Sequence, residues 1–191
     1  VNIPFAEPLV PGDDDRSWTT ALPDAVAPKA AADVPPAAWS KVWPAGGATP
    51  RGVVITSDPS QAADVVAFAN ALQWPVLAEP GSGARCGTTA ITHYLDVLGD
   101  ADLRPQIAIT VGRFALSRPV AAFVRSAERH VTVGRRELDP LLTADVQIAR
   151  LPDVSRLRPT DSAWLEMWRA ADQRASTVPR SRQQQLVQEV L

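Results

Sequence analysis

The stretch that decides the fold is Arg51-Gly52-Val53-Val54-Ile55-Thr56-Ser57, followed at once by Asp58-Pro59-Ser60. The first part is a short, β-branched apolar run, which is typical of a buried strand. The second part is a helix start with proline in the first turn. The residues that follow place apolar side chains on one helical face: Ala62, Val65, Val66, Phe68, Ala69 and Leu72. A buried strand that leads directly into an amphipathic helix predicts the first unit of an α/β fold.

The same alternation continues downstream. Further strands are predicted over residues 74–78, 106–111, 130–133 and 145–149, and helices over residues 89–98, 118–127, 162–175 and 182–190. Short, continuously apolar strands that alternate with amphipathic helices indicate a parallel sheet covered on both faces. We therefore predict a Rossmann-like three-layer α/β domain, with a mostly parallel sheet of five or six strands and helices on both faces.

The chain divides into three predicted parts: a Pro-rich interdomain connector (1–44), a central α/β domain (45–180) and a C-terminal helix or linker to a next domain (181–191). Half of the 18 prolines fall within residues 1–50, where no sustained period of 2 or 3.6 is visible. Trp18, Trp39 and Trp43 would anchor such a connector to a surface. The alternative is plain disorder, which the tryptophans disfavour because disordered tails are poor in aromatic residues.

Composition excludes several classes of protein. The net charge of −2 gives no electrostatic case for a nucleic-acid partner. Cys86 is the only cysteine, so no internal disulfide can form, and with only His93 and His130 beside it a zinc site is not expected. No apolar run has the length of a membrane span. A reducing, cytoplasmic compartment is therefore the expected location.

A glycine-rich loop at residues 81–87 follows a predicted strand and precedes a predicted helix, where a dinucleotide-binding loop belongs. Its spacing differs from that fingerprint, because Gly87 lies four residues after Gly83 instead of three. The loop also follows the second strand, not the first, and no acidic residue ends the next strand. An ordinary flexible loop between strand and helix is the alternative that these departures favour.

Arginines follow three successive strands: Arg85 after the second, Arg113 after the third and Arg136 after the fourth. The carboxyl ends of parallel strands share one edge of a sheet, where such sheets bind ligands. Guanidinium groups that converge there would grip a carboxylate bidentately. We therefore predict an anion site made of Arg113 and Arg136, with Arg85. The alternative is solvated loop charges, or salt bridges to a neighbouring domain.

Other reactive side chains lack the partners that catalysis needs. His93 lies in a predicted helix without a serine or cysteine motif around it, so we interpret it as a satisfied histidine. Cys86 lies beside Arg85, but no base is paired with it in the sequence. Trp164 and Trp168, four residues apart, are interpreted as core or interdomain packing. No catalytic, cofactor-binding or metal-ligating residue is predicted in this chain.

Motifs spread along the chain resemble those of the 2-succinyl-5-enolpyruvyl-6-hydroxy-3-cyclohexene-1-carboxylate (SEPHCHC) synthase family, in the right order and at compatible spacing. The first resembles the end of that family's first domain, and the rest its middle domain. They are Asn2-Ile3-Pro4-Phe5-Ala6-Glu7-Pro8-Leu9, Gly52-Val53-Val54, Trp74-Pro75-Val76-Leu77-Ala78-Glu79-Pro80, Ser82-Gly83 with Arg85, Val111-Gly112-Arg113, Arg118-Pro119, and Arg136 with Leu138-Asp139-Pro140.

The resemblance implies a cytoplasmic, homo-oligomeric transferase of menaquinone biosynthesis. Such an enzyme decarboxylates 2-oxoglutarate on thiamine diphosphate, with Mg²⁺ holding the diphosphate, and adds the succinic-semialdehyde unit to isochorismate. In that setting the predicted arginine site would receive a carboxylate of a substrate, or of a downstream aromatic acid acting as a feedback effector.

The chain departs from the family in lacking both of its cofactor motifs. The carboxylate that activates the thiazolium belongs to a preceding domain, and the Gly-Asp-Gly metal motif to a following one; neither has a match here. The resemblance therefore implies a central-domain fragment that contacts flanking thiamine-binding domains, binds no thiamine diphosphate or Mg²⁺ itself and is inactive alone. The alternative is an independent nucleotide- or anion-binding α/β module.

Overall fold

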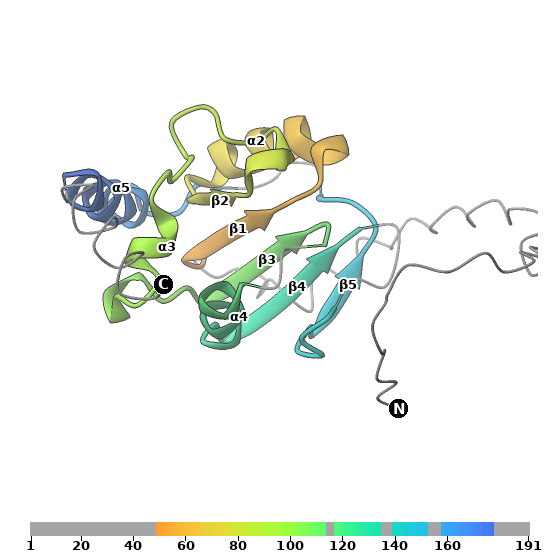
Figure 1. The fold of residues 1–191 in the computed structure, drawn as a ribbon. Coiled ribbons are helices and arrows are strands. Elements are labelled where there is room, and N and C mark those ends of the chain that lie inside the picture. The colour runs from red at the N-terminus through yellow and green to blue at the C-terminus, as the bar shows by residue number, and fades with distance from the viewer. Residues whose placement is uncertain (1–48, 114–116, 135–138, 153–157, 178–191) are drawn as a thin grey trace, which may run out of the picture. The chain divides into compact units, whose positions relative to one another are not determined.

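The core of the protein is a five-stranded sheet with the strand order β2-β1-β3-β4-β5, and every neighbouring pair is parallel (Figure 1). The structure, a computed structural model, describes residues 49–113, 117–134, 139–152 and 158–177. The strands are β1 (Gly52–Thr56), β2 (Val76–Ala78), β3 (Ile107–Val111), β4 (Arg129–Val133) and β5 (Val146–Ile148). The predicted parallel sheet is confirmed, with five strands in the described residues.

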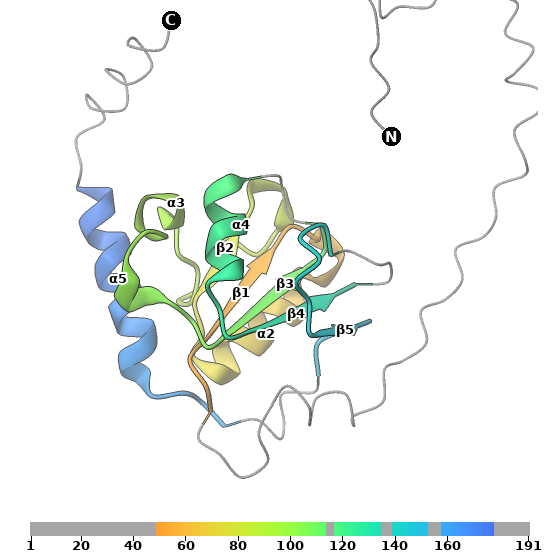
Figure 2. The same cartoon turned by 90° about the horizontal axis from the view of Figure 1, so that it is seen from below.

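Helices lie on both faces of this sheet, as predicted. The chain leaves β1 through α2 (Ala62–Leu72) to reach β2 on one side, and later returns to place β3 on the other side of β1. Helix α4 (Arg118–Arg125) lies in the crossover from β3 to β4, which runs in the direction opposite to the crossover from β1 to β2. Because parallel crossovers are right-handed, α2 and α4 lie on opposite faces. Figure 2 shows α4 in front of the strands and α2 behind them.

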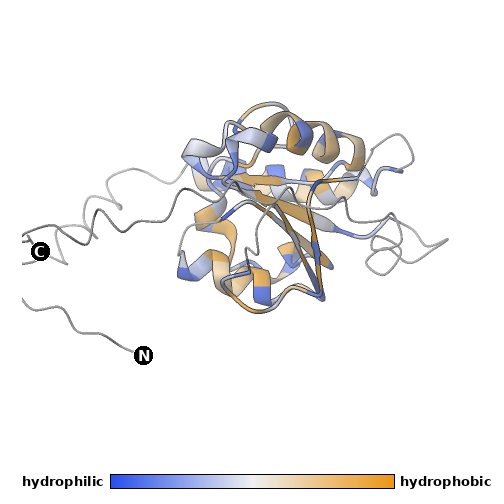
Figure 3. Ribbon diagram, turned by 90° about the vertical axis from the view of Figure 1, so that its right-hand side faces the viewer, coloured by the Kyte–Doolittle hydropathy of each residue, from blue (hydrophilic) through white to orange (hydrophobic). Residues whose placement is uncertain are grey.

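The central strands are buried along their whole length. All five residues of β1 and of β3 are buried, which explains why their sequences are apolar without alternation. In Figure 3 the hydrophobic colour runs along the strands and the inward sides of the helices. A short 3₁₀ turn, η2 (Pro59–Gln61), begins the first crossover, and the Asp58 carboxylate caps it by accepting a hydrogen bond from the Ser60 amide.

Helix α5 (Ser162–Ser176) closes the core against the amino end of β1. Trp164 and Trp168 are buried, and Trp168 makes an edge-to-face contact with Phe123 of α4 at 5.7 Å between ring centroids. The Trp164 indole donates a 2.8 Å hydrogen bond to the Gly52 carbonyl, 112 residues earlier in the chain. The packing role predicted for this tryptophan pair is confirmed.

A third tryptophan, Trp74, lies on the backbone of β1. It is fully buried, contacts the Phe68 ring edge-to-face at 5.9 Å, and donates from its indole to the Thr160 hydroxyl (2.7 Å) and the Pro50 carbonyl (3.0 Å). A Cβ atom on Gly52 would stand only 2.2 Å from this ring. Glycine at this position is therefore a packing requirement, because it makes room for the indole.

The helix predicted over residues 89–98 is mostly wrong. Only α3 (Tyr94–Val97) is helical, whereas residues 89–91 run along the outer edge of β2. The Val76 amide donates to the Thr89 carbonyl at 2.8 Å, and the Ile91 amide donates to the Val76 carbonyl at 2.9 Å. These residues satisfy backbone groups that the short edge strand would otherwise leave unpaired, and Thr89 and Ile91 are β-branched, which suits extended backbone.

The remaining turns complete the path between strands. They are η3 (Pro80–Ser82) and η4 (Ala101–Leu103). None of the helices in the described part has the length and apolar character needed to cross a lipid bilayer. The predicted connector (1–44) and C-terminal segment (181–191) lie outside the described residues, so the domain boundaries stay predictions.

A buried polar network joins β3, β4 and the turn before β5. The His130 ring contacts the Thr110 hydroxyl through Nε2 and the Thr143 hydroxyl through Nδ1, each at 2.9 Å. The His130 amide also donates to the Asp145 carboxylate at 2.8 Å. Burial lowers the pKa of His130, and the negative charges of Asp139 and Asp145 oppose this shift. The histidine therefore folds into the core in its neutral form.

We expect acid to destabilise the fold through His130. Its pKa is lower in the folded chain than the ordinary value near 6.5, so the unfolded chain binds the proton more readily. The stabilisation is fully present above pH of about 6.5 and is lost as the pH falls through this value toward the folded pKa. Urea unfolding at pH 7.5 and 5.5 should show this loss, and His130→Gln should reduce it. An equal loss in wild type and variant would contradict the assignment.

Candidate anion-binding site at the carboxyl edge of the sheet

The carboxyl ends of β1 and β3 form the switch point of this sheet. The chain moves from β1 to β2 in one direction and to β3 in the other, so the loops after β1 and β3 diverge at this point. Open α/β sheets bind ligands in the crevice at such a point. A ligand site is therefore expected at the residues that follow these two strands, 57–58 and 112–113.

Ser57 and Arg113 are joined across this switch point. The Ser57 hydroxyl donates a 2.5 Å hydrogen bond to the Arg113 carbonyl, and the Ser57 amide donates to the Val111 carbonyl at 3.1 Å. Gly112, which lies between Val111 and Arg113, has a positive φ of 76°, and a Cβ there would lie 2.6 Å from the Cβ of Asp58. Glycine is thus needed both for the backbone conformation and for the close approach. The two loops hold the backbone of Arg113 in one position.

The side chains of the three predicted arginines are placed differently. Arg113 is exposed at the switch point, and its guanidinium contacts no other described residue through a hydrogen bond or ion pair. Arg85 is exposed beside the edge strand, where its guanidinium donates to the Thr92 carbonyl at 3.4 Å. Arg136 lies outside the described residues. The site itself therefore stays a prediction, with Arg113 its described centre.

Arg85 also acts on a buried phenol. Burial raises the pKa of Tyr94, the Glu79 carboxylate raises it further, and the positive charge of Arg85 lowers it. This places Arg85 in the electrostatic neighbourhood of Glu79 and Tyr94, on the β2 side of the sheet. The interactions of the Arg85 guanidinium with the Thr92 carbonyl and with Tyr94 compete with its binding of an anion near β3.

The two places where a nucleotide phosphate could bind do not suit it: one is occupied by the Asp58 side chain, and the other lacks a helix directly after the glycine-rich loop. At the start of the first crossover, the Asp58 carboxylate itself accepts from the Ser60 amide and hydroxyl and from the Gln61 side chain. The glycine-rich loop places Gly83 and Gly87 at positive φ, but the next helix, α3, begins only at Tyr94 and has four residues. The geometry favours an ordinary loop over a dinucleotide site.

The other polar candidates have structural partners. His93 precedes α3, and both its backbone amide (2.5 Å) and its ring Nδ1 (3.2 Å) contact the Asp172 carboxylate of α5. The prediction of a satisfied histidine is confirmed. Cys86 is exposed. Among the described residues, no three histidine, cysteine or acidic side chains gather where they would hold a metal ion.

Sequence reasoning missed Ser57, which fixes the backbone of Arg113. The signal was available, because a hydroxyl residue directly follows the first buried strand. It also missed the His130 network, whose signal was a histidine inside a short predicted strand.

Comparison with known proteins supplies a family. No protein-family model matches the chain. A 2-succinyl-5-enolpyruvyl-6-hydroxy-3-cyclohexene-1-carboxylate synthase from Nocardioides sp. is 35% identical over 186 residues, which cover 92% of this chain and 33% of the relative. The enzyme of the same name from Geobacillus kaustophilus is 30% identical over 197 residues, which cover 88% of this chain and 34% of the relative.

A third relative agrees. The synthase of that name from Saccharopolyspora erythraea is 30% identical over 186 residues, covering 92% of this chain and 32% of the relative. The chain thus spans about a third of the length of the curated relatives that it matches. Since several synthases of one name align with nearly all of it, the chain belongs to the SEPHCHC synthase family, as a stretch about one third as long as its relatives.

Proposed function

We propose that this chain is the central α/β domain of a SEPHCHC synthase, a cytoplasmic, homo-oligomeric transferase of menaquinone biosynthesis. The observation that carries the proposal is the alignment of 92% of the chain with 33% of the Nocardioides enzyme at 35% identity. In this proposal the whole enzyme decarboxylates 2-oxoglutarate on thiamine diphosphate and adds the succinic-semialdehyde unit to isochorismate. The flanking domains of the same polypeptide hold thiamine diphosphate and Mg²⁺.

The residues described here do not fit thiamine diphosphate or its metal ion. The Asp58 carboxylate accepts a hydrogen bond from the Ser60 amide at the start of the first crossover, where a diphosphate would otherwise be bound. The described part also holds no group of acidic side chains suited to Mg²⁺. The role of this domain in the proposal is therefore to position its neighbours and to bind a carboxylate, not to carry the cofactor.

We expect the 191-residue chain to fold without binding thiamine diphosphate. Its α/β core is complete in the described residues, whereas the cofactor motifs are missing from the sequence. Calorimetric titration with thiamine diphosphate and Mg²⁺ should give no heat of binding, while the full-length synthase gives a saturable signal. Saturable binding to the chain itself, tighter than about 1 mM, would refute the assignment as a cofactor-free central domain.

The independent anion-binding module is the rival from a different class. The exposed guanidinium of Arg113 at the switch point is the observation that favours any anion site here. The coding sequence around this segment separates the two proposals. Flanking domains with the missing cofactor motifs support the synthase, whereas a start codon directly before Val1 and a stop codon after Leu191 support the module.

A further inference from the structure

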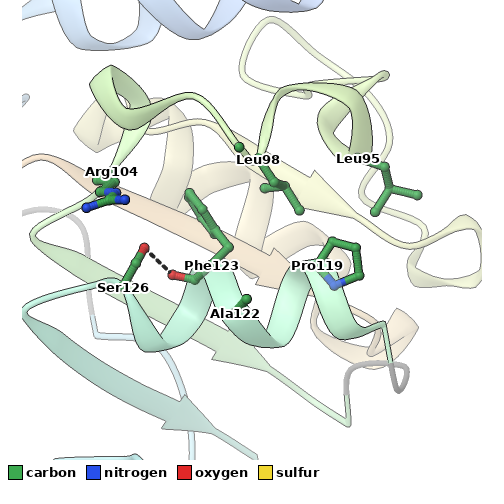
Figure 4. A pocket seen from close by; sticks show the side chains of 8 residues that line it. Leu95, Leu98, Arg104, Pro119, Ala122, Phe123 and Ser126 are labelled. Carbon is green, nitrogen blue, oxygen red and sulfur yellow. Dashed lines mark hydrogen bonds between the residues drawn. The ribbon is translucent and has the colours of Figure 1, made fainter.

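A pocket of about 270 Å³ lies between the α3–η4 segment and α4, on the face of the sheet that α4 covers (Figure 4). Its walls come from two stretches of chain that are separated by β3. The side chains that line it include Leu95, Leu98, Arg104, Pro119, Phe123 and Ser126.

Most of this pocket is apolar. The Phe123 ring is 3% exposed and forms a buried floor, and Leu98 lies above it between the two ends of the pocket (Figure 4). Leu95 stands at one end beside Pro119 and is 54% exposed, which makes it one of the few large apolar side chains that the described core leaves in water. Covering this surface would be favourable because it removes apolar area from water.

The other end of the pocket carries a single positive charge. Arg104 lies there beside Ser126 and is the only charged residue of the lining (Figure 4). Its backbone is extended, with φ −69° and ψ 125°, as expected for a residue before proline. Within the described ranges its guanidinium forms neither an ion pair nor a hydrogen bond. The Ser126 hydroxyl is already committed as a donor to the Phe123 carbonyl at 2.7 Å.

We propose that this pocket binds a small amphipathic carboxylate. The apolar body would lie on Phe123 and Leu98 toward Leu95, and the carboxylate would face Arg104, whose planar fork matches two oxygens. The positive charge of Arg104 would repel a cationic ligand. A phosphate dianion carries two negative charges, and the pocket offers only one positive charge to balance them. The volume is below that of pockets for drug-sized molecules, which indicates a body of one ring or a short branched chain. The proposal is independent of the reaction assigned to the family.

The test is a titration of the ¹⁵N-labelled chain with phenylacetate, followed by amide chemical shifts. Because so small a molecule gains little contact, we expect a dissociation constant on the order of 1 mM. The shifts should gather in residues 95–104 and 118–126. Arg104→Gln should weaken binding roughly fivefold to tenfold, and the neutral analogue 2-phenylethanol should bind wild type correspondingly less well.

Two further variants make the result specific to this pocket. Ala122→Phe fills the pocket from an exposed position of α4 and should abolish the shifts. Arg125→Gln removes an exposed charge of the same helix that does not line the pocket, and should change nothing. Shifts elsewhere or none in wild type, equal weakening by Arg104→Gln and Arg125→Gln, or equal affinity for the alcohol would each overturn the proposal. The chemical-shift changes of the wild-type chain test the proposal even where a variant fails to fold.

Discussion

Gly52→Ala is expected to destabilise the fold by about 3 kcal/mol, the upper part of the range for inserting a methyl group into a packed core. The new Cβ would stand 2.2 to 2.3 Å from three ring carbons of Trp74, which is far inside van der Waals contact. The indole cannot move aside cheaply, because Phe68 contacts it edge-to-face and Thr160 and Pro50 accept its N–H. The strain must therefore be shared between β1 and the aromatic core.

Urea unfolding followed by circular dichroism measures this loss. Gly99→Ala is the matched control, since a Cβ there would meet no atom within 4 Å, and it should leave the midpoint nearly unchanged. In the double variant Gly52→Ala with Trp74→Leu, the smaller side chain should make the cost of the alanine clearly lower than in wild type. Equal midpoints for the two alanine variants would show that the indole is not fixed as described.

Arg113→Ala and Arg136→Ala are each expected to weaken the binding of small carboxylates to the full-length synthase by about tenfold to a hundredfold. A hydrogen bond between charged groups is worth about 1.5–3 kcal/mol, which corresponds to that range. Arg113 is placed for such contact, because its backbone is held at the switch point by Ser57 and Gly112. A solvated rim charge would change binding little.

The measurement is the binding or inhibition constant of substrate-like and aromatic acids for the wild-type enzyme and each variant. Arg125→Ala removes an exposed arginine at the far end of α4 and serves as the control. Ser57→Ala should give an intermediate loss of about fivefold, because one hydrogen bond that positions Arg113 is removed. If the constants stay the same in both arginine variants, these residues do not form an anion site.

The strands of this fold were predictable because their burial is two-sided. In β1 and β3 every residue is covered, so the chain needs continuous apolar runs, and these runs are visible without any alignment. The helices α2, α4 and α5 were predictable for a related reason, since each shows one apolar face and an opening signal such as Asp58, Pro119 or Asp161.

What sequence could not supply depends on contacts between distant residues. The segment at residues 89–91 adopts extended backbone because β2 is an edge strand whose outer groups need partners, which is a property of the sheet and not of the segment. The Ser57–Arg113 bond spans 56 residues, and the pocket beside Arg104 needs α3 and α4 to be placed first. The positions of the arginines after successive strands were readable, whereas the directions of their side chains were not.

The bond between Trp164 and the Gly52 carbonyl also has a consequence for how the protein is made. The first strand leaves the ribosome long before its last partner, because 112 residues separate the two groups. At a synthesis rate of about 5–20 residues per second, the amino end of β1 waits roughly 5–20 s for α5. During this interval the apolar strands are incompletely covered, so chaperone capture should be strongest for nascent chains that end before residue 164 and should fall once α5 has emerged.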